Sequence, residues 1–200
     1  MKWKFYERLP QWVEYGGKRY RLNLTVANVL RYIDLCDDPQ SFNDREITEI
    51  GFAWLVRGGK RLSVTHKAEI LALVVRQYVS PPRRQLNNYK PQSVVNFYHD
   101  SGYIYAAFMQ TYGIDLYQQA EKLHWCRFLA LFDGLPEECV IKQIMGIRAR
   151  EIPLPNSYNH GDIQRLTELK ALYALPAENK PEDTQSGWNR LFDILEANAR

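Results

Sequence analysis

Apolar residues fall on every second position on both sides of the pair Gly16-Gly17. The alternating residues are Val13, Tyr15, Tyr20, Leu22 and Leu24. A period of two is typical of a strand with one buried face, so the pattern predicts a β-hairpin over Trp12 to Leu24. Two glycines suit its turn because a type I′ connection needs positive φ at both central residues.

The spacing changes to three and four residues after Thr25, which predicts three helices before residue 80. Thr25 is placed to cap the first helix, and Asn43 with Glu46 three residues later has the form of a capping box for the second. Pro81-Pro82 ends the third, because proline lacks the amide proton and clashes with the preceding turn. The expected helices run from Thr25 to about Cys36, from Asn43 to Gly58-Gly59, and from Thr65 to Tyr78.

Four more helices are expected after a polar, proline-punctuated stretch from Ser80 to Ser93, which predicts a linker or long loop. Gly113 supplies a C-cap for the first of them. Pro136 suits the first residue of the third, because its missing amide would be unpaired there. The four are Asp100 to Tyr112, Gln118 to Asp133, one that begins at Pro136 and buries Val140, Ile141, Ile144 and Met145, and one over Ile163 to Tyr173.

The end of the chain has a polar stretch, Ala177 to Gly187, and then a short amphipathic helix from about Ser186 to Ala199. The pattern as a whole predicts a mainly α fold, with an N-terminal β-hairpin followed by a bundle-like domain of seven or eight helices. We expect one folded unit overall, in which the parts are 1–80 (hairpin plus three helices), 81–93 (linker loop), 94–176 (helical core region) and 177–200 (polar tether and C-terminal helix).

Charge and cysteine content narrow the function classes. The 200 residues include 26 basic and 23 acidic ones, and the net charge of +3 is too small to imply binding to DNA. The cysteines Cys36, Cys126 and Cys139 are few and odd in number, which favours free thiols in a reducing compartment. The N-terminus lacks the apolar stretch of a signal peptide, and no window reaches the length of a membrane span, so we expect a cytoplasmic protein.

No arrangement of residues predicts catalysis or metal binding. The four histidines are scattered, and His124 and Cys126 face different sides of a helix because two residues turn it by about 200°. Gly58-Gly59-Lys60 lacks the rest of a phosphate-binding loop and is better explained as a helix stop. The acidic pairs Asp37-Asp38 and Glu137-Glu138 lie at expected helix ends, where solvated carboxylates are common. We therefore expect no enzyme, no metal and no cofactor.

Three segments of the second half carry a family resemblance. They read YIYAAFMQTYGIDL from Tyr103 to Leu116, HWCRF from His124 to Phe128, and LFDGLP from Leu131 to Pro136. They resemble the bacteriophage gene-product-fifteen family of long-tailed phages and prophages of Gram-positive bacteria. Three shorter segments are also similar to that family, namely Gly16 to Tyr20, Ile144 to Arg148 and Tyr173 to Pro176. The first half departs most from the family's pattern, at the basic Arg57 to Arg61 turn and the Pro81-Pro82 loop.

The resemblance implies a tail-assembly chaperone that acts in the cytoplasm of the bacterial host. Such a protein coats the long, hydrophobic tape-measure protein, helps to recruit tail-tube subunits and leaves the finished virion. The possibility that the chain forms a homo-oligomer is left open. No catalytic residue comes with the resemblance. Two alternatives remain open, a permanent structural tail or neck protein of the virion and a nucleic-acid-binding regulator.

Aromatic and apolar residues at helical spacing are the candidate protein-interface residues. Tyrosine is enriched at interfaces because one end of its side chain is apolar and the other tolerates water. The tyrosine candidates lie in and just after one expected helix and are Tyr103, Tyr105, Tyr112 and Tyr117. The candidates on the C-terminal helix are Trp188, Leu191, Phe192 and Leu195.

Overall fold

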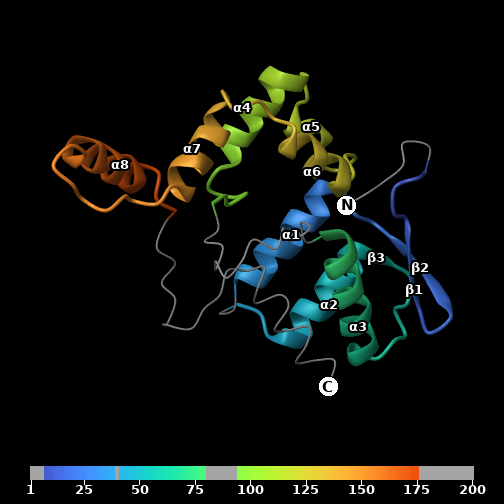
Figure 1. Ribbon diagram of the computed structural model, residues 1–200. Coiled ribbons are helices and arrows are strands. Elements are labelled where there is room, and N and C mark those ends of the chain that lie inside the picture. The colour runs from blue at the N-terminus through green and yellow to red at the C-terminus, as the bar shows by residue number, and fades with distance from the viewer. Residues whose placement is uncertain (1–6, 39–40, 80–93, 176–200) are drawn as a thin grey trace. The chain divides into compact units, whose positions relative to one another are not determined.

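The computed structural model of the chain describes residues 7–38, 41–79 and 94–175 (Figure 1). Their contacts divide them into two compact units. Unit 1 comprises residues 7–38, 41–79 and 117–131, and unit 2 comprises residues 94–116 and 132–175. The fold is mainly α with an N-terminal β-hairpin, and the described residues form eight α-helices, which confirms the fold class expected from the sequence.

The hairpin consists of β1 (Trp12–Tyr15) and β2 (Lys18–Leu22), joined through Gly16 at φ 56° and Gly17 at φ 72°. A third strand that the sequence did not predict, β3 (Val56–Arg57), pairs antiparallel with β2, so the strand order is β1-β2-β3. The helix before Gly58-Gly59 ends at Leu55, so the two intervening residues, Val56 and Arg57, are extended and join the sheet. A two-residue strand carries no periodicity, which is why the pattern did not show it.

The helices of the first half are α1 (Val26–Asp37), α2 (Asp44–Leu55) and α3 (Val64–Val74). The Thr25 cap of α1 and the Asn43 and Glu46 capping box of α2 are confirmed. The third helix begins one residue before the expected Thr65, because Ser63 is the N-cap and accepts the His66 amide proton. It continues as a π-helical turn, η1 (Val75–Val79).

The expected single helix over Gln118 to Asp133 is wrong, because the structure has a four-residue helix α5 (Leu116–Gln119), a turn, and then α6 (Trp125–Asp133). The backbone carbonyls of this turn accept hydrogen bonds from the start of α1. The Ala120 and Leu123 carbonyls accept the amide protons of Ala27 and Val26, at 3.0 and 2.9 Å. These amides open α1 and have no partner within that helix. A tertiary cap for α1 therefore interrupts the periodic segment.

The core of unit 1 lies among α1, α2, α3 and the inner face of the sheet, and α6 closes it with the fully buried Trp125. The Trp125 ring stacks on Phe128 with centroids 5.3 Å apart, and its indole N–H donates to the Val79 carbonyl at 3.0 Å. Gly51 on α2 lies against the ring of Tyr32 on α1, where even a methyl group would overlap. These contacts leave little free space around the aromatic residues.

Unit 2 is built from α4 (Ser101–Tyr112), α7 (Val140–Ala149) and α8 (His160–Leu172). The expected C-cap of α4 is confirmed, since Gly113 has φ 65°. The expected helix start at Pro136 is wrong: residues 136–139 form a turn in which the Cys139 amide bonds the Pro136 carbonyl, and α7 begins at Val140. The prediction that α7 buries Ile141 and Ile144 is confirmed, since both are buried against α4, but Val140, which was also expected to be buried, is half exposed.

Candidate functional site

Large apolar side chains are exposed mainly in unit 2. Among the described residues, ten large apolar side chains are exposed, and eight of these belong to unit 2. The eight are Tyr98, Tyr103, Met109, Val140, Ile152, Leu154, Tyr158 and Leu172. Scattered exposed apolar residues are normal, but their concentration in one part of a protein indicates a surface that binds a partner.

Three of these residues, including the two most exposed, lie in the segment 150–159 between α7 and α8, which we term the apolar loop. Leu154 is 88% and Tyr158 96% exposed, and Ile152 is 49% exposed. Leu154 stands between Pro153 and Pro155, which restrict the backbone and lower the entropy that the segment loses on binding. The hydrophobic pattern assigns no helix or strand to this segment, yet an apolar residue enclosed by two prolines is the signal that could have identified the loop.

Asparagine side chains hold the second half of the apolar loop in place. The side-chain Nδ2 of Asn159 donates to the Leu154 carbonyl at 2.9 Å, and the side-chain Oδ1 of Asn159 accepts the backbone amide proton of Asn156 at 2.7 Å. The Asn156 side chain in turn accepts the amide proton of Tyr158 at 2.9 Å. The loop therefore has a defined turn that presents its apolar side chains to solvent without their having to pack on the protein.

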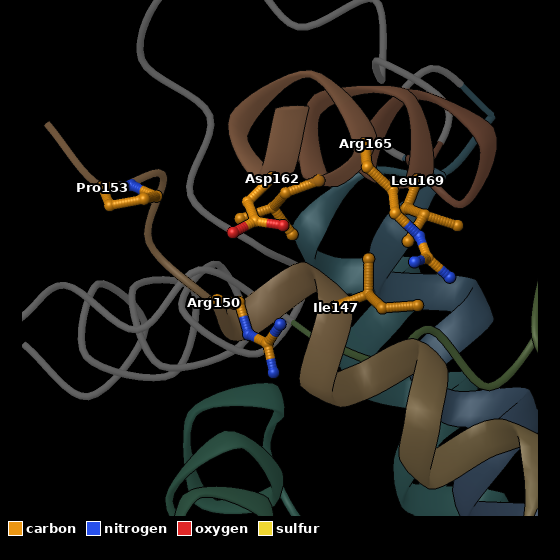
Figure 2. A pocket seen from close by; sticks show the side chains of 7 residues that line it. Ile147, Arg150, Pro153, Asp162, Arg165 and Leu169 are labelled. Carbon is orange, nitrogen blue, oxygen red and sulfur yellow. The ribbon is translucent and has the colours of Figure 1, made fainter. Parts of the chain in front are cut away.

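An open depression of about 480 Å³ lies beside the apolar loop, between α7 and α8 (Figure 2). Figure 2 shows Ile147 on α7, Arg150 and Pro153 on the loop, and Asp162 and Arg165 on α8 around it. Leu166 and Leu169 complete the lining. An apolar floor with charged groups at the rim is suited to an amphipathic segment of another protein, and it holds no pair of groups arranged for acid-base or nucleophilic catalysis.

A buried ion pair fixes the ends of the unit 2 helices. Arg148, near the end of α7, donates to both carboxylate oxygens of Asp100, at 2.7 and 2.9 Å. It also donates to the carbonyls of Val94 at 3.0 Å and Tyr173 at 2.7 Å. Lys170 of α8 donates to the Arg148 carbonyl at 2.7 Å. One arginine thus joins the residue before α4, the end of α7 and the end of α8, and so positions the apolar loop.

Sequence reasoning did not pair Asp100 with Arg148. The two residues are 48 positions apart, so no helical or hairpin spacing connects them. Arg148 was noted only within a segment that carries the family resemblance, and Asp100 only as the start of a helix. The side chains of Arg148 and Asp100 are only 12% and 2% exposed, and this burial cannot be read from the sequence.

The three tyrosine candidates on α4 do not form one patch. On α4, the side chain of Tyr103 is 42% exposed, whereas Tyr105 and Tyr112 are partly buried on the other side of the stripe that contains Ile104 and Phe108. Tyr112 packs edge-on against Phe108 with centroids 5.7 Å apart. Tyr117 is 81% exposed but belongs to unit 1. The second set of candidates, Trp188, Leu191, Phe192 and Leu195, lies outside the described residues.

His124 and Cys126 take structural positions in unit 1. Burial lowers the pKa of His124, whose Nε2 lies 3.2 Å from the Pro10 carbonyl. The Nδ1 of the same ring accepts the Cys126 amide proton, so neutral His124 donates from Nε2 to Pro10. Burial raises the pKa of the Cys126 thiol to about 12, which keeps it protonated and unreactive. Within the described ranges, no three His, Cys, Asp or Glu residues are grouped so as to hold a metal ion.

None of the helices in the described residues combines the length and the apolar composition that a membrane crossing requires. A family model described as Bacteriophage Gp15 protein matches residues 5–175. No curated protein and no solved structure matches the chain. The match covers both units and includes the apolar loop and the Asp100–Arg148 ion pair.

Proposed function

The chain belongs to the bacteriophage Gp15 protein family and is therefore a phage structural or morphogenesis protein, and from this premise we propose that it is a non-enzymatic tail-assembly chaperone. In this role it binds apolar stretches of the tape-measure protein in the cytoplasm of the host and helps to recruit tail-tube subunits. The observation that carries the proposal is the apolar loop, an ordered segment whose large apolar side chains are exposed in the absence of a partner.

The energetics of such a surface suit a partner that must later be released. Covering one large apolar side chain contributes about 1.5–3 kcal/mol, so covering the three in the apolar loop contributes on the order of 5–9 kcal/mol. Association costs about 4–15 kcal/mol in lost translational and rotational freedom and ordered side chains. The two terms nearly offset, which gives a reversible complex rather than a permanent one. A chaperone that hands its client to a growing tail needs that balance.

The test is co-expression with the tape-measure protein encoded by the same phage. We expect the chain to raise the fraction of tape-measure protein in the soluble lysate and to copurify with it. The double variant Leu154→Ser with Tyr158→Ser should lose both effects while its melting temperature stays unchanged, because both side chains are more than four-fifths exposed. The matched control is Arg45→Ser with Gln77→Ser, two exposed polar positions in unit 1, which should keep both effects.

Purified particles distinguish the chaperone from a permanent structural protein. A chaperone is absent from mature virions, whereas a tail or neck protein is present in fixed stoichiometry. Quantitative mass spectrometry of particles therefore decides between the two. Full client binding by the Leu154→Ser, Tyr158→Ser variant would contradict the assignment of the apolar loop.

A further inference from the structure

The outer face of the three-stranded sheet in unit 1 is basic. The register places Trp12 opposite Arg21 and Arg21 opposite Arg57, so these three side chains form one row across β1, β2 and β3. Arg19 and Glu14 form the neighbouring row on the same face, because side chains alternate along a strand. All five residues are exposed. The inner face carries the buried residues of the sheet, which are Val13, Leu22 and Val56.

Arg21 and Arg57 face each other without a counter-charge. Like charges at directly opposed positions destabilise a pair of strands. Within the described part of the chain, no carboxylate lies within ion-pairing distance of either guanidinium, whereas Arg31, Lys67 and Arg148 each pair with an acid. Folding gains nothing from this opposed pair. An unneutralised pair that costs stability therefore indicates an anionic ligand.

The residues around this row add to its charge. The turn after β3 contains Lys60 and Arg61, both exposed. The face and this turn thus contain five basic residues and one acid, while the whole chain has a net charge of only +3. This part of unit 1 is therefore strongly basic.

Trp12 gives the basic face an apolar contact. Its side chain is 44% exposed, and the Arg19 guanidinium lies over the ring, 5.4 Å from its centroid. A flat aromatic surface next to guanidinium groups can pack against the carbon atoms of a peptide while the arginines bind its carboxylates through paired N–H donors.

We propose that this basic sheet face, comprising Trp12, Arg19, Arg21 and Arg57, is a docking surface for an acidic segment of a partner protein. A protein segment fits the observations better than nucleic acid does. The face spans three short strands and offers one aromatic side chain, whereas a single-strand site needs a groove with a series of stacking residues and a larger basic excess. The inference goes beyond the proposed function, because the apolar loop belongs to unit 2 and uses none of these residues.

The test measures binding of a fluorescein-labelled peptide of alternating Asp and Glu to the full chain at low ionic strength. The double variant Arg21→Gln with Arg57→Gln should weaken binding by about tenfold, since it removes two charge-assisted hydrogen-bond donors. The control Arg45→Gln with Arg76→Gln removes the same charge from exposed positions on α2 and η1 and should change affinity by less than about twofold. The melting temperature of the sheet variant should be equal to or above that of the wild type, because the like-charge repulsion is gone.

Three outcomes overturn the proposal. The first is the absence of saturable peptide binding. The second is an equal loss of affinity in the control variant, which would show a nonspecific response to net charge. The third is tighter binding of a charge-matched single-stranded oligonucleotide, which would make the face a nucleic-acid site. None of these results depends on whether the chain acts on a tape-measure protein, so a failure here is distinct from a failure of the chaperone proposal.

Discussion

Replacing Arg148 by methionine tests whether one ion pair holds unit 2 together. The substitution keeps a long side chain that can fill the space and removes all four side-chain hydrogen bonds that Arg148 donates. The Asp100 carboxylate is left in a site where only 2% of its side chain is exposed. It retains a bond from the Asn96 amide, at 2.9 Å, and loses its counter-charge.

The expected cost follows from that burial. Removing one partner of a buried ion pair destabilises a protein by about 3–5 kcal/mol, because an uncompensated charge remains. A whole domain is stabilised by only about 5–15 kcal/mol. The loss should therefore open unit 2 locally and leave unit 1 largely folded. The double variant Asp100→Asn with Arg148→Met removes the buried charge as well and should recover at least about 1 kcal/mol relative to Arg148→Met alone.

Hydrogen exchange measured by mass spectrometry gives the stability of each unit separately, which a single thermal transition does not. Amides of α7 and α8 should exchange about a hundredfold faster in Arg148→Met, since about 3 kcal/mol corresponds to that factor. Amides of α2 and α3 serve as the internal reference and should change little. The reasoning is refuted if α7 and α8 lose less than about 1 kcal/mol of protection, or if the double variant is no more stable than the single one.

Four further substitutions probe unit 1 and α4 by thermal melting. Gly51→Ala should destabilise the protein by about 1–3 kcal/mol because the added methyl group would overlap the ring of Tyr32. Gly102→Ala, with no atom within 4 Å of the added Cβ, should stabilise the protein by up to about 1 kcal/mol. Equal effects of the two substitutions would contradict the packing described for α1 and α2. Asn43→Ala should cost about 1 kcal/mol because it removes the capping bond of α2, and no loss would show that the cap is dispensable. Burial lowers the pKa of His124 in the folded protein, so on acidification the unfolded chain takes up the proton first, and the stability of the fold should fall as the pH drops below about 6.5. His124→Gln should flatten this pH dependence of stability. An unchanged slope in the variant would exclude His124 as its source.

Local sequence rules predicted most of the helices and the caps. The hairpin turn, the Thr25 and Asn43 caps and the Gly113 stop each depend on residues within a few positions of one another, and each is confirmed. The errors occur where distant parts of the chain meet. The helix expected over Gln118 to Asp133 is broken because its carbonyls cap α1, a need that no residue in that segment reveals. The third strand depends likewise on β2, which precedes it by more than thirty residues.

The candidate surfaces were harder to predict than the fold, for a related reason. A tyrosine at helical spacing has the same pattern whether it is buried or exposed, and on α4 the sequence could not separate Tyr103 from Tyr105 and Tyr112. The apolar loop has no helical or strand period at all. Its exposure becomes visible only when the structure shows that the asparagine bonds complete the turn without covering Leu154 or Tyr158.

The two units use their apolar residues differently, and this difference bears on how one chain could serve two partners. Unit 1 buries Tyr32, Phe52, Trp125 and Phe128 in its core and exposes charge on the sheet, where the opposed arginines gain nothing from folding. Unit 2 exposes apolar side chains, and its apolar core is supplemented by a buried ion pair and by side-chain bonds to backbone carbonyls. A surface that must remain available to a hydrophobic client cannot also be used to stabilise its own fold. Polar contacts such as those of Arg148 and Asn159 can hold such a surface in shape without covering it, so the proposed client surface and the unusual stabilisation of unit 2 have one physical explanation.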